Sequence, residues 1–261
     1  MAEVLFYERP VPLNRGAHKD LRLKGVPNMK FAMNVHSVPI IGTEFGVAAR
    51  DVAIVFAGTD AATAGPVALL GLRPNENLYV DADGQWAPNI YIPAFVRRYP
   101  FVLAEKPADQ VGGDDFTVFL DERYEGFNTT EGERLFNVDG TDTEMLTRAV
   151  GFLSEFQQNV ARTKWFVEQL NKHDLLEPRN IRLQKDGEDG AEGKSINLNG
   201  LFVVNENKLR TLDEKTTHEF AREGIFGWIY AHILSLSNID RLTQRLDMRE
   251  QAEAAGSTIR N

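Results

Sequence analysis

Short apolar runs, separated by glycine, proline or aspartate, dominate the first 140 residues of the chain. Several of these runs are rich in β-branched residues, which favour extended backbone, so they predict strands. We expect strands at 4–7, 35–41, 52–56, 67–72, 78–80, 101–104 and 116–120. Only two short helical segments, 43–50 and 93–99, are predicted between them. Because strands and helices do not alternate regularly, the pattern favours a curved, mainly antiparallel sheet over a parallel one.

The spacing of apolar residues changes at residue 141. Thr141 and Glu144 have the spacing of a capping box, which marks the start of a helix. Apolar residues then follow at helical spacing, at Leu146, Ala149, Leu153, Phe156, Val160, Val167 and Leu170. A helix from 141 to 172 would be about 45 Å long, so we expect it to pack across the sheet or against a second copy of the chain. We expect the Glu177–Pro178 step to end this region, because the residue before a proline disfavours helical backbone.

The rest of the chain predicts a hairpin followed by helices. Residues 181–184 and 195–204 are expected to pair around an exposed, charged loop at 186–194. Asp213 is the expected N-cap of a helix that Gly224 ends. A final helix is predicted from the apolar stripe of Trp228, Ile229, Ile233, Leu236, Ile239, Leu242 and Leu246.

Together these patterns predict an α+β protein. The curved, mainly antiparallel sheet comes from the N-terminal half, and it is packed with long helices from the C-terminal half. We interpret residues 1–261 as a single domain with a strand-rich part at 1–140 and a helix-rich part at 141–249, which contains the hairpin near 181–204. The polar residues 250–261 predict a frayed tail.

Composition narrows the classes of function. The 261 residues carry a formal net charge of −9, which opposes binding to a nucleic-acid backbone. Cysteine is absent, so disulfides and thiolate chemistry are excluded. No apolar stretch has the roughly 18–20 residues of a membrane span, and residues 1–16 lack the pattern of a secretory signal. We therefore expect a cytoplasmic protein, with export by a route without a signal as the alternative.

Residues 67–103 contain an unusual combination of two apolar strands, an Asn/Asp/Gly turn, a lone tryptophan and an aromatic-basic segment. Together with the elements Pro12-Leu13-Asn14, Val38-Pro39, Glu44-Phe45 and Ile229-Tyr230-Ala231-His232, this segment resembles the bacterial SapC family over almost the whole chain. That family takes its name from a surface-layer gene cluster and has no established reaction. The resemblance implies a non-catalytic accessory protein with a protein partner or a surface-layer component, serving a surface layer or a peptide-modification or uptake system.

The aromatic-basic segment is the strongest candidate for a binding surface. Aromatic and arginine side chains bring large contact area and forked hydrogen bonds to one place. The candidate residues are Trp86, Tyr91, Phe95, Arg97, Arg98 and Tyr99. The alternative is a packing role, in which Phe95 and Tyr99 face the sheet and Arg98 forms an internal ion pair.

We assign no catalytic residue and expect no cofactor. The alternative from a different class is an iron-dependent oxygenase, in which His18, Asp20 and His232 supply two imidazoles and a carboxylate. His232 lies beside an apolar helical stripe, where a hydrogen-bonded packing histidine is the simpler interpretation. Asp81-Ala82-Asp83-Gly84 begins like a calcium loop, but Ile92 stands where that pattern needs a carboxylate, so a tight turn explains these residues more economically.

Overall fold

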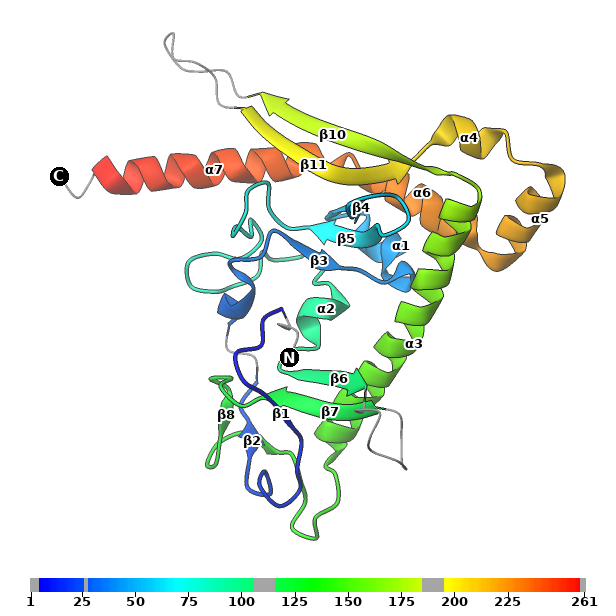
Figure 1. Cartoon of the computed structure of the whole chain (residues 1–261). Coiled ribbons are helices and arrows are strands. Elements are labelled where there is room, and N and C mark those ends of the chain that lie inside the picture. The colour runs from blue at the N-terminus through cyan, green and yellow to red at the C-terminus, as the bar shows by residue number, and fades with distance from the viewer. Residues whose placement is uncertain (1–4, 26–27, 106–115, 185–194, 259–261) are drawn as a thin grey trace.

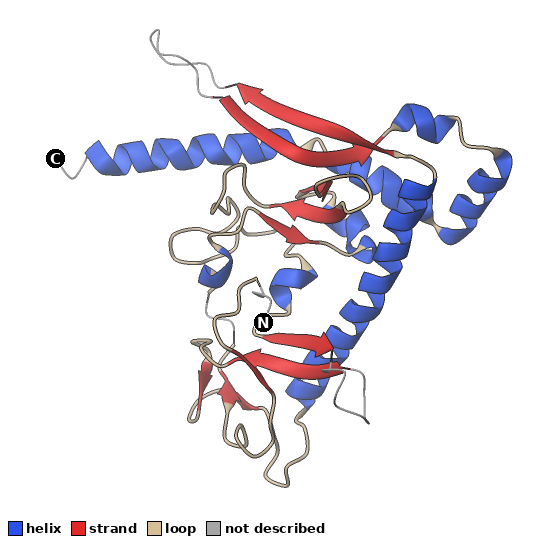
Figure 2. Cartoon of the chain, viewed as in Figure 1, coloured by secondary structure: helices blue, strands red, loops and turns tan. Residues whose placement is uncertain are grey.

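The computed structural model describes residues 5–25, 28–105, 116–184 and 195–258. Within these residues the protein is an α+β fold with three antiparallel sheets and a long helix beside them (Figures 1 and 2). The central sheet has the strand order β10-β11-β4-β5-β3. Its strands are β3 (Ser37–Pro39), β4 (Ala53–Ala57), β5 (Gly65–Leu69), β10 (Leu176–Gln184) and β11 (Ser195–Val204).

The central sheet joins the two halves of the sequence. β4 and β5 pair from Ala53 with Leu69 to Ala57 with Gly65, and β11 adds to β4 through Leu201 with Ala57 and Phe202 with Phe56. The hairpin of the C-terminal half therefore completes a sheet that the N-terminal half begins. β11 matches the predicted strand at 195–204, whereas β10 begins at Leu176 and not at the predicted residue 181. The predicted connecting loop at 186–194 lies outside the described residues.

Two small sheets lie together at the other end of the molecule (Figure 1). One contains β1 (Pro10–Pro12), β7 (Phe116–Asp121) and β6 (Phe101–Glu105), in that order. The other contains β8 (Phe127–Asn128), β2 (Arg22–Leu23) and β9 (Glu133–Arg134).

The long helix α3 (Glu144–Lys172) runs from the small sheets to the central sheet (Figure 1). Near its start, Leu146 and Leu153 pack in the apolar core of the small sheets with Leu120. Further along, Phe156 and Phe166 pack in the core of the central sheet. The predicted apolar stripe of α3 thus packs into two hydrophobic cores of the same chain.

The remaining described helices are shorter than α3, and the last is the longest of them. A 3-10 helix at Lys30–Ala32 and another at Gly42–Glu44 precede α1 (Phe45–Ala48), and α2 (Ala94–Arg97) precedes β6. The C-terminal half adds α4 (Glu206–Arg210), α5 (Glu214–Glu223), α6 (Ile225–Ser235) and α7 (Asn238–Thr258). Asp213 caps α5 by accepting a hydrogen bond from the Thr216 N–H, and Gly224 follows it with left-handed backbone, as predicted.

Two predicted helix boundaries are wrong, whereas α3 ends at Lys172 as predicted. The N-cap of α3 is Thr143, not Thr141, because the Thr143 hydroxyl accepts from the Leu146 N–H while Thr141 lies in a turn with Asp139. The Glu177–Pro178 step lies inside β10, where a proline is tolerated because β10 is an edge strand. The predicted last helix breaks between Ser235 and Asn238.

The break has a visible cause in tertiary hydrogen bonds. The Asn238 side chain donates to the carbonyl oxygens of Ala49 and Val52, and the Ser235 hydroxyl accepts from the Ile54 N–H. These bonds attach the α6–α7 junction to α1 and β4. The structure also extends α7 to Thr258, through residues predicted to fray.

Two predicted strands are absent from the described residues. Phe6 has a positive φ of 81°, and residues 5–6 form a turn; residue 4 lies outside the described part. Val80 forms only an isolated bridge to Trp86. The predicted strand at 35–41 is shortened to β3, and the predicted helix at 93–99 is shortened to α2, since Pro100 disfavours helical backbone at Tyr99.

Candidate functional site

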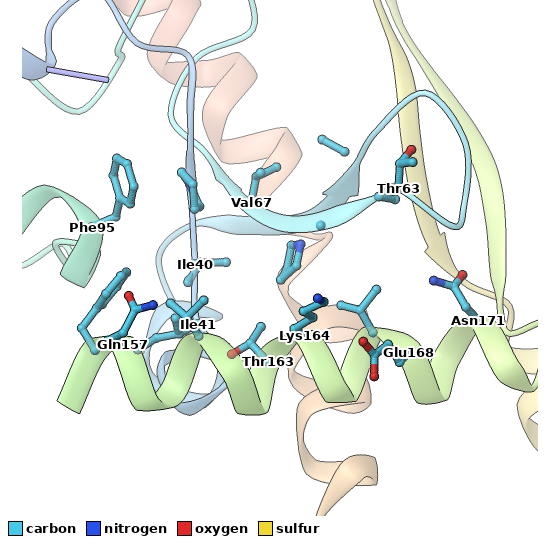
Figure 3. Close-up of a pocket in the computed structure, with 18 of the residues that line it drawn as sticks. Ile40, Ile41, Thr63, Val67, Phe95, Gln157, Thr163, Lys164, Glu168 and Asn171 are labelled. Carbon is cyan, nitrogen blue, oxygen red and sulfur yellow. The ribbon is translucent and has the colours of Figure 1, made fainter. Parts of the chain in front are cut away.

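A groove of about 730 Å³ lies between α3 and the β3–β5 side of the central sheet (Figure 3). Its size falls within the range of about 300–1,000 Å³ that is typical of small-molecule sites. The α3 side is formed by Phe156, Gln157, Val160, Thr163, Lys164, Val167, Glu168 and Asn171. The opposite side is formed by Pro39, Ile40, Ile41, Ala57, Ala62, Thr63, Ala64, Gly65, Pro66 and Val67, with Phe95 and Arg98 of the α2 region at one end.

The walls of the groove are predominantly apolar. Ile40 and Val67 approach from the sheet, and Val160 approaches from α3. Val160 belongs to the predicted stripe, yet its side chain is 37% exposed because it faces the groove instead of a core. An apolar ligand would therefore find preformed contact area here.

Thr163 closes the α3 side of the groove by a bond to the opposite wall. Its hydroxyl accepts a hydrogen bond from the Gly42 N–H at 2.9 Å and donates to the Asn159 carbonyl oxygen at 2.6 Å. The hydroxyl is thus used for fixing α3 to the 3-10 helix at Gly42–Glu44.

Arg98 is the half-buried cation of the groove. Its guanidinium carbon lies 3.9 Å from the centre of the Phe95 ring and 5.3 Å from that of Phe156. Burial lowers the pKa of Arg98, and the nearby Tyr7 hydroxyl opposes that effect. Among the described residues, the buried Nε atom of Arg98 has no hydrogen-bond partner. This end of the groove therefore carries a positive charge.

Glu44 positions the α2 end of the groove. This buried carboxylate accepts hydrogen bonds from the Tyr91 hydroxyl at 2.7 Å, the Ala94 N–H at 2.6 Å and the Ile41 N–H at 3.3 Å. Burial, supported by the bond to Glu44, raises the pKa of Tyr91 to about 12. Glu44 thus ties the start of α2 to the strand connection that carries Ile40 and Ile41.

The six predicted interaction residues divide into three groups. Phe95 and Arg98 line the groove. Arg97 is exposed beside a separate cavity of about 280 Å³, where its Nη2 donates to the Tyr91 hydroxyl at 3.2 Å. Tyr99 is buried and donates to Asp121 at 3.1 Å, and Trp86 stacks on Tyr79 with ring centres 5.9 Å apart. The structure therefore places two of these residues in the groove and uses Tyr99, Trp86 and Tyr91 for internal contacts.

The structure does not bring His18, Asp20 and His232 together. His18 Nδ1 accepts from the Asn14 N–H, and Asp20 pairs with Arg134. Both ring nitrogens of His232 are engaged, Nδ1 with the Ile54 carbonyl oxygen at 2.8 Å and Nε2 with the Val204 N–H at 3.1 Å. His232 is thus the packing histidine of the simpler interpretation.

Other side chains of metal-binding type are used in turns or stand apart. The Asp81 carboxylate accepts from the N–H groups of Asp83 and Gln85, as a tight turn requires. In the described ranges, no three His, Cys, Asp or Glu side chains form a group that could hold a metal ion. Nor does any helix of these ranges combine the length and the apolar character of a membrane-spanning segment.

Most groove residues were missed by the sequence analysis. They come from the distant segments 39–41, 57–67 and 156–171, so no single stretch of sequence contains the site. The one available signal was Val160, an apolar α3 position that the structure leaves without a core to fill.

Comparison with known proteins places the chain in a family. A family model described as SapC matches residues 13–242, which is most of the chain. No curated protein and no solved structure matches the chain significantly. The match spans the central sheet, α3 and the groove. The resemblance carried by residues 67–103 is thereby confirmed, and the chain belongs to the SapC family.

Proposed function

We propose that this SapC-family chain is a non-catalytic binding protein, and that its ligand occupies the groove between α3 and the β3–β5 side of the sheet. The observation that carries the proposal is the groove itself, a preformed cavity of about 730 Å³ with apolar walls. Sites of this size and character are where proteins hold small molecules, because burial of apolar surface provides most of the binding free energy.

The walls of the groove are fixed by hydrogen bonds, which favours binding of a ligand without a change in the shape of the groove. Thr163 fixes α3 to Gly42, and Glu44 fixes α2 to the same connection. Both walls are therefore held by buried hydrogen bonds before a ligand arrives. Preorganised walls reduce the conformational entropy that binding would otherwise cost.

The wider role that we propose is that of an accessory component. The family resemblance supports service to a surface layer or to a peptide-modification or uptake system, with a protein partner or a surface-layer component. We propose the cytoplasm as its compartment, with export by a route without a signal as the alternative. In either setting, the groove is the part of the chain that recognises the ligand.

The experiment that tests the proposal fills the groove and measures probe binding. Val160→Trp places a large ring in the groove at a position that is 37% exposed. Val47→Trp is the matched control, because Val47 is also 37% exposed and lies on α1 outside the groove lining. The probe is 1-anilinonaphthalene-8-sulfonate, whose fluorescence rises in apolar surroundings.

We expect one probe site per chain in the wild type and in Val47→Trp, and an affinity lower by about tenfold or more in Val160→Trp. Unfolding curves for both variants check that each remains folded. Equal probe binding by the two variants would contradict the proposal, because the probe would then bind outside the groove.

A further inference from the structure

We infer that the ligand is a long-chain carboxylate whose acyl chain lies along α3 and whose carboxylate binds Arg98. This inference rests on the proposed function, and it adds the chemical class and the orientation of the ligand. The ligand would resemble a fatty acid, with one anionic end and an extended apolar body.

The charge at one end comes from Arg98. Its side chain lines the groove, and its guanidinium carbon lies 3.9 Å from the centre of the Phe95 ring and 5.3 Å from that of Phe156. Within the same part of the chain, no Asp or Glu forms an ion pair with Arg98. A carboxylate is the natural complement, because a planar guanidinium can donate two parallel hydrogen bonds to its two oxygens.

The length of the groove fits an extended chain. Its α3 side runs from Phe156 to Asn171, which corresponds to about 22 Å at the helical rise. The hydrocarbon core of a bilayer is about 30 Å thick, so a single acyl chain reaches roughly 15 Å. Figure 3 shows Phe95 and Gln157 near one end and Glu168 and Asn171 near the other, with Ile41, Val67 and Thr163 between them. An acyl chain that starts at Arg98 therefore has apolar wall along its length.

The backbone of the sheet side favours an acyl chain over a peptide. A bound peptide needs partners for its own N–H and C=O groups, usually from an exposed strand. The N–H groups of Ile40, Ile41 and Gly42 already donate to Pro66, Glu44 and Thr163. Pro39 and Pro66 have no N–H to offer. An acyl chain makes no such demand.

Lys164 is a second cation on the groove, and a ligand whose carboxylate bound Lys164 would lie in the opposite orientation. Its side chain is exposed on α3, so a carboxylate there would remain in water and gain little from the pairing. The half-buried Arg98 is the stronger site, because a desolvated charge-assisted hydrogen bond contributes more.

The experiment compares dodecanoate with dodecan-1-ol by titration calorimetry. These two ligands share the chain and differ in charge, so the comparison in the wild type needs no mutation. We expect dodecanoate to bind at least about tenfold more tightly than the alcohol. Arg98→Met should remove this difference, and Lys164→Met should retain it. Arg162→Met is the matched control, since Arg162 also stacks on an aromatic ring, that of Trp228 at 5.0 Å, and lies on α3 outside the groove lining.

The possible results separate the inference from the proposed function. Equal affinity for the two ligands in the wild type, or loss of the difference in Lys164→Met alone, would overturn the assignment to Arg98. Tighter binding of an apolar peptide with a free C-terminal carboxylate would overturn the acyl class. In each case, if Val160→Trp still blocks the ligand that does bind, the groove remains the site; if it blocks none, the proposed function itself fails.

Discussion

The Cα of Gly42 packs directly on the indole ring of Trp228. A Cβ added at Gly42 would lie 2.3 Å from Cζ3 of that ring, far inside contact distance. The same glycine donates its N–H to Thr163 of α3. Gly42 is therefore the point at which the groove wall, α3 and α6 meet, and only a residue without a side chain allows that approach.

Gly42→Ala should destabilise the protein by about 1–3 kcal/mol, because the new methyl group forces the Trp228 ring to move in a packed site. Gly46→Ala is the control: it lies in α1 and a Cβ there has nothing within 4 Å. Gly46→Ala should raise the free energy of unfolding by about 0.4–1 kcal/mol, because alanine lowers the conformational entropy of the unfolded chain. Urea unfolding measures both values. If the two variants unfold at the same urea concentration, the close packing of Gly42 on Trp228 is wrong.

Glu44→Leu should destabilise the protein by about 3 kcal/mol, since it leaves the Tyr91 hydroxyl and the N–H groups of Ala94 and Ile41 buried without an acceptor. Glu44→Gln retains a carbonyl acceptor and should lose less. Tyr91→Phe removes one bond and should cost about 1 kcal/mol. Guanidinium unfolding of the three variants gives the order. A loss in Glu44→Leu no larger than that in Tyr91→Phe would show that this carboxylate does not organise α2.

His232 should make stability depend on pH. Burial lowers the pKa of His232 from 6.5 to about 4 in the folded chain. Its Nε2 accepts from the Val204 N–H, so a proton there would face another donor. The unfolded chain therefore binds this proton more readily. The lowered pKa of neutral His232 stabilises the folded chain by about 3 kcal/mol above about pH 6.5, and this contribution is lost as the pH drops toward 4.

The measurement is the free energy of unfolding at several pH values between 7 and 4, for the wild type and for His232→Gln. The variant should be less stable at pH 7 and should show a flatter dependence over this interval. Parallel curves for the two proteins would mean that other groups cause the acid sensitivity.

Light scattering should give a mass near that of one chain, 29.3 kDa. The sequence left open a homodimer through the long helix. In the structure, however, the stripe residues Leu146, Leu153, Phe156, Val167 and Leu170 are buried within the chain. A homodimer through this stripe would have to expose two cores. A doubled mass that persists on dilution would contradict this expectation.

The sequence predicted the elements whose signals are local. The runs at 52–56 and 67–72 became β4 and β5, because β-branched residues bounded by turn residues suit a buried strand. The apolar stripe after residue 144 became α3. The α+β class followed from these patterns and is confirmed.

The boundaries that failed depend on distant partners. Thr141, with Glu144 three residues later, satisfies the capping-box pattern and Thr143 does not, but the Thr143 hydroxyl donates to the carbonyl oxygen of Arg134. Likewise, the helical spacing of apolar residues continues through 235–238. The helix breaks there because the Asn238 side chain forms hydrogen bonds to the carbonyl oxygens of Ala49 and Val52. No local pattern carries such information.

The groove was hidden for the same reason. Phe95 and Arg98 were among the predicted residues, but residue type alone does not distinguish a position in the groove from an internal position such as Tyr99. That distinction depends on α3 passing beside β5, a contact between segments about 100 residues apart in the sequence.

The most direct test of the central claim is methyl NMR of the wild-type chain titrated with dodecanoate. We predict that the methyl signals of Ile40, Ile41, Val67, Val160 and Val167, all on the groove, shift together. The signals of Val47 and Leu234, which are exposed elsewhere, should stay unchanged. Shifts at Val47 or Leu234 with unchanged groove methyls would contradict the account, because the ligand would then bind to another surface.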